Sequence, residues 1–219
     1  NCFAPRSKSL RKVSTNQIIM KKILQTFLFT FTLPLFAAAE PVDLDKIISY
    51  LDSMKTLRAN FTQVNQDGST SAGALYIKKP GKLRMTYEPP DNSVVIVRDK
   101  FVSIFDGKNN GLYQKLSIEN NPFRLLLSSA HEMNLDSMTI DFNSNDSRTK
   151  VTVSDSKNID QGVLEIIFNN RPLTLEHWLL TNSLNEKVTV HLTNLSVIDE
   201  LQDSLFDPSI ELNKMPNKP

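Results

Sequence analysis

Short segments in which apolar and polar residues alternate recur along this chain, at a spacing of roughly ten residues. In the segment LRMTY, the side chains of Leu83, Met85 and Tyr87 fall on one face of a strand, and those of Arg84 and Thr86 fall on the other. Turns that contain Gly, Pro, Asn or Asp separate these segments. The pattern predicts a mainly β protein, an antiparallel meander curled into a barrel or a sandwich.

Two segments interrupt the β pattern with helical signals. Apolar residues follow Asp43 at helical spacing as far as Met54, and we expect Asp43 to cap this helix and the helix to end near Leu57. The segment 120–129 (NNPFRLLLSS) is too apolar for a solvated loop, and Pro122 suits the first turn of a short helix. The chain is therefore expected to be mainly β with a few helices.

Residues 20–39 have the three parts of a secretory signal peptide. Two lysines stand near their start, an apolar run spans 23–36, and three alanines end at Ala39. The run is shorter than the ~20 residues that a helix needs to cross a membrane. We therefore expect cleavage after Ala39, export to the periplasm and a single domain of residues 40–219, with residues 1–19 as an upstream extension outside the fold.

The charge of the chain is divided unevenly between this leader and the rest. The first 39 residues hold six of the 25 Lys and Arg residues and none of the 24 Asp and Glu residues, so residues 40–219 carry a formal net charge of −5. This charge argues against a nucleic-acid partner. The single cysteine, Cys2, also precedes the domain, which is therefore expected to be stable without disulfides.

The sequence offers little that resembles catalytic chemistry. His131 begins a segment, HEMNL, that lacks the second histidine of a zinc motif because Leu135 stands in its place. His177 and His191 lie in alternating segments and are expected to be ordinary strand residues. Glycine-rich phosphate loops and nucleophile elbows are absent from the sequence. We expect no enzyme activity, no metal and no cofactor.

Six segments, in order along residues 40–219, carry a resemblance to a known family. They are FTQ at 61–63, GALYIKKPGKLRMTY at 73–87, PDNSVVIV at 90–97, FVSIFD at 101–106, NPFRLLL at 121–127 and DSLFDP at 203–208. Each is short, but the set with its order resembles the LolA family, the periplasmic carriers of outer-membrane lipoproteins.

The resemblance implies an incomplete antiparallel β-barrel, with an apolar concave face covered by short helices. In this family the concave face receives the acyl chains of a lipoprotein, and residues 122–129 occupy the position of its lid. From alternation alone the same face is an ordinary core, and a shift of one residue in register exchanges the two faces. The cavity-lining residues that we expect are Leu75, Ile77, Leu83, Met85, Tyr87, Val95, Val97, Ile104 and Phe123, and the lid and latch residues are Lys79, Pro122, Phe123 and Leu126.

Two positions depart from the family pattern. Met85 stands where an aromatic residue is common, and Lys79 stands where some members have an arginine that helps to hold the lid closed. The ammonium of lysine, unlike the guanidinium of arginine, does not present hydrogen-bond donors in a planar fork. A weaker closure, or one made by Arg84 or Arg124, is therefore expected.

The resemblance also implies the partners. An inner-membrane ABC transporter would release acylated lipoproteins to this protein, which would pass them to an outer-membrane receptor or to the outer membrane itself. We expect a monomer that needs no cofactor and binds no nucleic acid. The open alternatives are a carrier of a free lipid or glycolipid and a lipoprotein-sensing regulatory domain of the same fold.

Overall fold

The structure is a computed structural model that describes residues 42–108, 112–119, 121–129, 138–156 and 162–215. The expected signal peptide, its cleavage site and the HEMNL segment lie outside these residues. The described residues all belong to the compact unit that follows residue 39.

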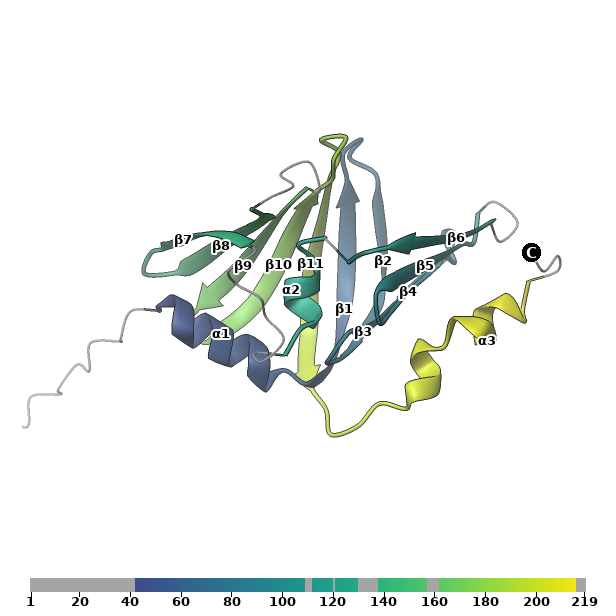
Figure 1. Cartoon of the computed structure of the whole chain (residues 1–219), viewed down its shortest axis with the longest axis horizontal. Helices are drawn as coiled ribbons and strands as arrows, with labels where there is room; N and C mark the ends of the chain where they lie inside the picture. The colour runs from purple at the N-terminus through teal and green to yellow at the C-terminus, as the bar shows by residue number, and fades with distance from the viewer. Residues whose placement is uncertain (1–41, 109–111, 120, 130–137, 157–161, 216–219) are drawn as a thin grey trace, which may run out of the picture. The chain divides into compact units, whose positions relative to one another are not determined.

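The described residues form an eleven-stranded antiparallel sheet in the order β6-β5-β4-β3-β2-β1-β11-β10-β9-β8-β7 (Figure 1). β6 and β7 stand at the two ends of this order, so the sheet curls without closing. The predicted fold class, mainly β with an incomplete antiparallel barrel, is confirmed. The strands are β1 (Thr56–Asn65), β2 (Thr70–Lys78), β3 (Lys82–Tyr87), β4 (Val94–Arg98), β5 (Phe101–Asp106), β6 (Leu112–Ser117), β7 (Met138–Ser144), β8 (Arg148–Asp155), β9 (Val163–Asn170), β10 (Leu173–Thr181) and β11 (Lys187–Val197).

Four turns of the first half of the sheet contain residues with a positive φ, among them the β3–β4 turn, where Asn92 has a φ of 54°. Gly68 between β1 and β2 has a φ of 80°, Gly81 between β2 and β3 has 72°, and Asp99 between β4 and β5 has 58°. Glycine adopts this region without a steric penalty, and aspartate tolerates it better than most residues. These turn residues therefore allow the chain to reverse between the alternating segments.

The first helix, α1 (Leu44–Ser53), begins where the sequence predicts it. The carboxylate of Asp43 caps it by accepting a hydrogen bond of 2.8 Å from the backbone N–H of Lys46. The predicted end near Leu57 is wrong by about one turn. Leu57 belongs to β1, which begins at Thr56, and the strand pairing on both sides outweighs the helical spacing of the apolar residues.

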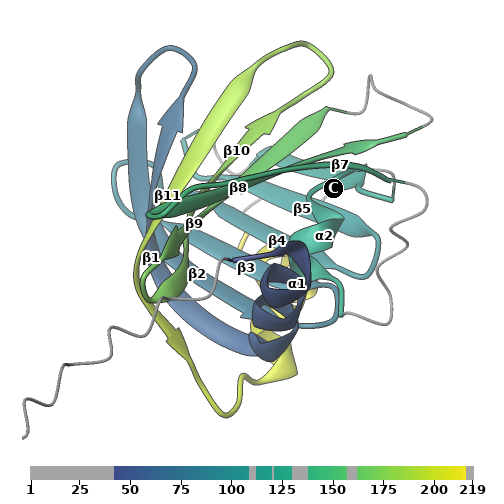
Figure 2. The same ribbon diagram turned by 90° about the vertical axis from the view of Figure 1, so that its left-hand side faces the viewer.

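One face of the sheet is concave, and α1 and the short helix α2 (Arg124–Leu127) lie within its curve (Figure 2). The largest apolar core joins this face to Ile47 and Leu51 of α1 and to the three leucines of α2. Fully burying one such side chain stabilises the fold by about 1.5–3 kcal/mol. The predicted short helical segment is confirmed. None of the helices in the described ranges combines the length and the apolarity that crossing a bilayer requires.

The convex face carries a second apolar layer that the alternation of the strands does not predict. A short 3-10 helix, η5 (Asp203–Phe206), and the helix α3 (Pro208–Leu212) run along the outside of the sheet beside β3 and β4 (Figure 1). Phe206 is fully buried there against Val94, Ile96 and Phe105. The DSLFDP segment therefore covers the part of the convex face that β3, β4 and β5 form.

β4 is consequently packed on both sides. Val95 and Val97 face the concave core, whereas Val94 and Ile96 face Phe206. The sequence of a strand that is covered on both faces is typically a continuous run of apolar residues. This explains why VVIV does not alternate as its neighbours do.

Candidate functional site

The strand register brings the predicted lining residues onto one face of the sheet. Leu75 pairs with Met85, Met85 with Val95 and Val95 with Ile104, which makes one row across four strands. Alternate residues of paired strands share a face. The other predicted strand residues lie in the neighbouring rows. In one row Leu83 pairs with both Ile77 and Val97, and in another Tyr87 pairs with Gly73.

This common face is covered unevenly. Leu75 and Leu83, at 0 % and 1 % exposed, lie in the core beneath the helices. Towards the edge of the sheet the cover ends, and Leu112 and Leu116 of β6 are 53 % and 52 % exposed. Leu116 pairs with Val102, which itself pairs with Val97, so these side chains continue the concave face. We call the partly uncovered side chains of β4–β6 on this face the apolar strip: Val95, Val102, Ile104, Leu112 and Leu116.

The sequence interpretation missed the β6 part of the strip. Leu112 and Leu116 are four residues apart in a strand and therefore share a face with each other. The signal was present, but their placement on the concave face depends on the β5–β6 register, in which Ile104 pairs with Gln114.

The segment at the position of the predicted lid bridges the two halves of the sheet. The backbone N–H of Gly81, in the β2–β3 turn, donates a hydrogen bond of 2.9 Å to the carbonyl of Leu127. On the other side the ring of Phe123 meets Trp178 of β10 edge to face, with the ring centroids 5.6 Å apart. Pro122 and Leu126 are buried. The segment therefore rests on both walls of the concave face.

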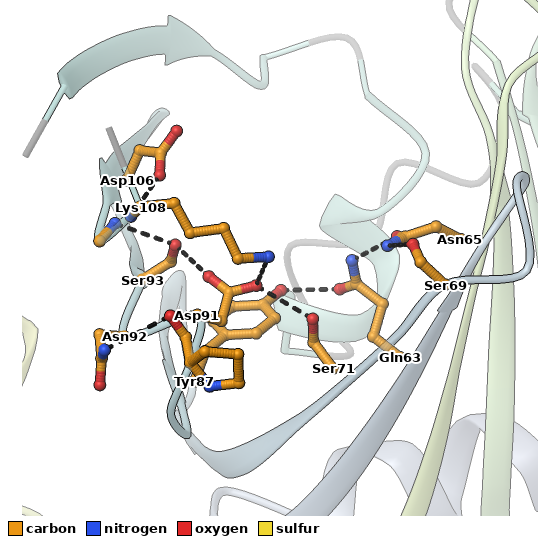
Figure 3. Close-up of polar contacts among 12 residues, drawn as sticks. Gln63, Asn65, Ser69, Ser71, Tyr87, Asp91, Asn92, Ser93, Asp106 and Lys108 are labelled. Atoms are coloured by element: carbon orange, nitrogen blue, oxygen red, sulfur yellow. Dashed lines mark hydrogen bonds and ion pairs between the residues drawn. The ribbon is translucent and has the colours of Figure 1, made fainter. Parts of the chain in front are cut away.

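A cleft of about 360 Å³ lies at one end of the apolar strip, beside the β3–β4 and β5–β6 turns. We call it the polar cleft because one wall is polar (Figure 3). Its apolar wall consists of Val95, Ile104 and Leu112. The side chains that give the other wall its polar character are Gln63, Tyr87, Asp91, Ser93, Asp106, Lys108 and Gln114.

Two hydrogen-bonded groups build the polar wall. The Tyr87 hydroxyl donates to Oε1 of Gln63 over 2.7 Å, and burial, followed by the charge of Asp91, raises the pKa of Tyr87. Asp91 accepts hydrogen bonds from the hydroxyls of Ser71 (3.0 Å) and Ser93 and pairs with the Lys108 ammonium at 3.1 Å. Burial alone would raise the pKa of Asp91, but the hydrogen bonds that it accepts, first that from Ser93, hold the pKa below its usual value.

The histidines in the described ranges have ordinary strand positions, as predicted. His177 of β10 pairs in register with His191 of β11, and their ring centroids are 4.8 Å apart. Burial lowers the pKa of His177, and the neighbouring His191 adds to the effect. Within the part of the chain that the structure describes, no three or more His, Cys, Asp or Glu side chains gather in a way that could hold a metal ion.

The sequence model of the family described as "Outer membrane lipoprotein carrier protein LolA" matches residues 52–209. The chain belongs to the LolA family. The matched range includes every strand of the sheet together with α2, η5 and the start of α3, and the family description names a carrier protein.

Known relatives agree with this membership. An uncharacterised protein of Rickettsia prowazekii is 26% identical over 189 residues, which is 85% of this chain and 87% of that protein. An outer-membrane lipoprotein carrier protein of Francisella tularensis subsp. novicida is 27% identical over 197 residues, 86% of this chain and 92% of that one. The protein of the same name in Methylococcus capsulatus is 34% identical over 93 residues, 38% of this chain and 45% of that one.

Two solved structures match with low similarity. A LolA superfamily protein of Nitrosomonas europaea aligns with a TM-score of 0.44 and 9% identity, over 77% of this chain and 99% of that chain. A DUF1329 family protein of Desulfovibrio piger aligns with a TM-score of 0.47 and 10% identity, over 75% of this chain and 94% of that chain.

Lys79, the departure from the LolA pattern at the predicted latch, contacts α1. Its ammonium donates a hydrogen bond of 2.7 Å to the carbonyl of Leu51, near the end of that helix. Burial lowers the pKa of Lys79 to about 8, and the nearby charge of Asp52 opposes part of the shift. Its role as a latch stays a prediction.

The two arginines considered as substitutes for this latch lie elsewhere. Arg84 points to the convex face, where it meets Glu211, so it does not contact the lid. Arg124 donates a hydrogen bond of 2.6 Å to the carbonyl of Glu119, which follows β6.

Proposed function

We propose that this protein carries lipoproteins through the periplasm, from the inner membrane to the outer membrane. The acyl chains of the cargo lie on the concave face, first along the apolar strip and then beneath α1 and α2. The protein moves its cargo without chemical change and acts as a chaperone for its lipid part.

The observation that carries this proposal is the uncovered apolar strip. A sheet that serves only as a core buries its apolar face, whereas Leu112 and Leu116 leave about half of their surface in water beside Val102 and Ile104. Contiguous exposed apolar side chains on a concave surface are typical of a binding site. In a LolA family member the fitting ligand is an acyl chain.

The energetics explain why such a strip suits a carrier. Burying an acyl chain is worth about 0.8 kcal/mol per CH₂ group, so a lipoprotein leaves its membrane only for another apolar surface. The attraction of the strip is spread over many side chains. The cargo can therefore be released stepwise to a better acceptor.

Under this proposal the predicted lining residues divide into two sets, apart from Tyr87, which lines the polar cleft. Val95 and Ile104 belong to the strip and meet the first part of the guest. The buried residues become available when α1 and α2 move away from the sheet, with Phe123 and Leu126 carried by the moving lid. The buried set is Leu75, Ile77, Leu83, Met85 and Val97.

The route and the partners follow from the carrier role. Residues 20–39 direct export, and cleavage after Ala39 releases the protein into the periplasm. An inner-membrane ABC transporter supplies the cargo, and a receptor in the outer membrane, or the membrane itself, takes it. The carrier works as a monomer because the open concave face must meet both partners in turn.

The experiment is a release assay with spheroplasts of the source bacterium. The exported protein is purified, added to spheroplasts with ATP, and the supernatant is assayed for outer-membrane lipoproteins in one-to-one complex with it. A variant with both Leu112→Glu and Leu116→Glu should release little cargo, because charge on the strip repels acyl chains.

Phe101→Glu is the matched control. Phe101 is 44% exposed on β5, its register partner is Ser117, and its side chain is on the convex face. Normal release by this variant and loss in the double variant support the proposal. Equal release by all three proteins, or copurification of a free lipid in place of lipoproteins, overturns it, the latter in favour of a free-lipid carrier.

A further inference from the structure

We infer that the polar cleft binds the carbonyl-bearing head of the cargo lipid, the neutral ester and amide groups through which acyl chains are attached. This inference rests on the proposed function, because it adds a head subsite to an acyl-chain surface. It assigns the guest an orientation and a selectivity that an apolar strip alone does not give.

The cleft is held in shape by contacts within the protein. Gly107 brings the β5–β6 turn against the β3–β4 turn, and its backbone N–H donates a hydrogen bond of 3.1 Å to the Ser93 hydroxyl. A Cβ at this position would come within 2.4 Å of the carbonyl oxygen of Asp91. At the other end of the wall, Nε2 of Gln63 donates to Asn65 over 2.8 Å while its Oε1 accepts from Tyr87. A site that is organised before binding does not lose the free energy of ordering its own groups.

Two side chains of the cleft, Lys108 and Gln114, have N–H groups that can donate hydrogen bonds to a ligand. The Lys108 ammonium has three N–H bonds, and its side chain is 55% exposed although it pairs with Asp91. The Asp91 side chain is 16% exposed, so the ion pair stays formed, and the remaining N–H bonds of the ammonium can donate to a guest. Gln114 points into the cleft from β6, and no hydrogen bond joins its side-chain amide to another residue in the described ranges.

The charges of the cleft favour a neutral head over an anionic one. Asp91 and Asp106 line it together with the single ammonium of Lys108, so carboxylates outnumber cations. A phosphate head would face this excess of negative charge. Ester and amide carbonyls carry no charge and offer acceptor oxygens to the N–H donors of Lys108 and Gln114.

The cleft is continuous with the strip. Ile104 and Leu112 line the cleft and also belong to the strip, so a single guest can contact both. Val102 and Leu116 lie further along the same strands, towards the β4–β5 turn. The head therefore lies between the β3–β4 and β5–β6 turns, and the chains extend along the strip away from them.

The test compares two probes that differ in their carbonyl groups. One is a synthetic lipopeptide whose N-terminal cysteine carries two ester-linked chains and one amide-linked chain. The other is its analogue with the same chains and the same amide, in which ether linkages replace the two esters, so that the probes have equal charge. Their affinities are measured by competition with a fluorescent fatty acid, for the exported protein and for a variant with Lys108→Met and Gln114→Leu. Lys115→Met, which removes an ammonium from the convex face of β6, is the control.

The expected result is that the wild type and Lys115→Met prefer the ester probe, by about fivefold for each hydrogen bond made. The cleft variant should lose this preference and still bind the ether probe. Equal affinity of the wild type for both probes, or a preference retained by the cleft variant, overturns the head subsite while the acyl-chain surface stands. Tighter binding of phosphatidylglycerol than of either probe overturns the neutral head. If neither probe displaces the fatty acid, the proposed function fails, and the head subsite fails with it.

Discussion

Arg84 and Glu211 form an ion pair across the convex face, with Nη2 of the arginine 2.8 Å from Oε1 of the glutamate. The two side chains are 12% and 9% exposed. The arginine also donates to the carbonyl of Leu205, over 3.2 Å. The pair therefore ties β3 to the C-terminal segment on the side away from the apolar strip.

Glu211→Gln should lower the free energy of unfolding by about 2–3 kcal/mol, because it leaves a largely buried guanidinium without its countercharge. Urea denaturation measures the change. Glu176→Gln is the control, since Glu176 pairs with Arg148 at a more exposed position and should cost less than about 1 kcal/mol. Equal losses in the two variants would contradict a structural role for the convex pair.

The stability of the protein should rise between about pH 8 and pH 10.5 through Lys79. Its pKa is about 8 in the folded protein and 10.5 in its ordinary state, so the unfolded chain binds more protons in this window. Unfolding then becomes less favourable as pH increases. The effect on the free energy of unfolding is on the order of 3 kcal/mol at full deprotonation. Denaturation at several pH values should show this rise in the wild type and not in Lys79→Met, and parallel curves for the two proteins would show that Lys79 is not the group responsible.

The fluorescence of Trp178, the single tryptophan of the chain, should report on the lid. Its ring touches Phe123, so Phe123→Ala should expose the indole, shift its emission to longer wavelength and increase quenching by iodide. The lost packing should cost about 1–2 kcal/mol, less than in a full core because Phe123 is half-buried. Ile210→Ala, on the convex side, should leave the emission unchanged. Unaltered quenching in Phe123→Ala would mean that the lid does not shield Trp178 in solution.

Gly107→Ala should destabilise the protein by about 2 kcal/mol, since the new Cβ would overlap the backbone of Asp91 and Asn92. Gly68→Ala provides a comparison of a different kind. Gly68 has a φ of 80° and open space around it, so its substitution costs about 1 kcal/mol through backbone strain alone. Thermal unfolding of both variants measures the difference between their losses of stability. A larger loss for Gly68→Ala than for Gly107→Ala would show that the β3–β4 and β5–β6 turns are not in close contact.

The strands were predictable from the sequence because two independent signals, the alternation of apolar and polar residues and the positions of turn residues, agree. Alternation gives the face of each residue, and the turn residues give the ends, so the segment FVSIFD coincides with β5 and KVTVHLTNLSV with β11. The end of α1 was not predictable in the same way. Helical spacing continues to Leu57, and strand pairing decides the conformation of that residue.

The sequence also did not allow a prediction of which parts of the concave face the helices cover. Leu83 and Ile104 have the same periodicity, yet the first is 1% exposed and the second is partly open, because the difference depends on where α1 and α2 rest. The convex layer depends on Phe206, a lone aromatic residue in a short polar segment, which carries no periodic signal. The polar cleft joins turns distant in sequence, and only the register brings them together.

Under the proposed function, the layer formed by Phe206 would have a mechanical consequence for the loading of a guest. Because β4 is packed from both sides, the half of the sheet that carries the apolar strip is supported from behind and resists bending. Room for a bulky guest is then gained by displacing α1 and α2 rather than by spreading strands. Guests of different width could then enter while the hydrogen bonds between the strands stay intact, and the sheet would be the fixed part of the proposed carrier and the helices its adjustable part.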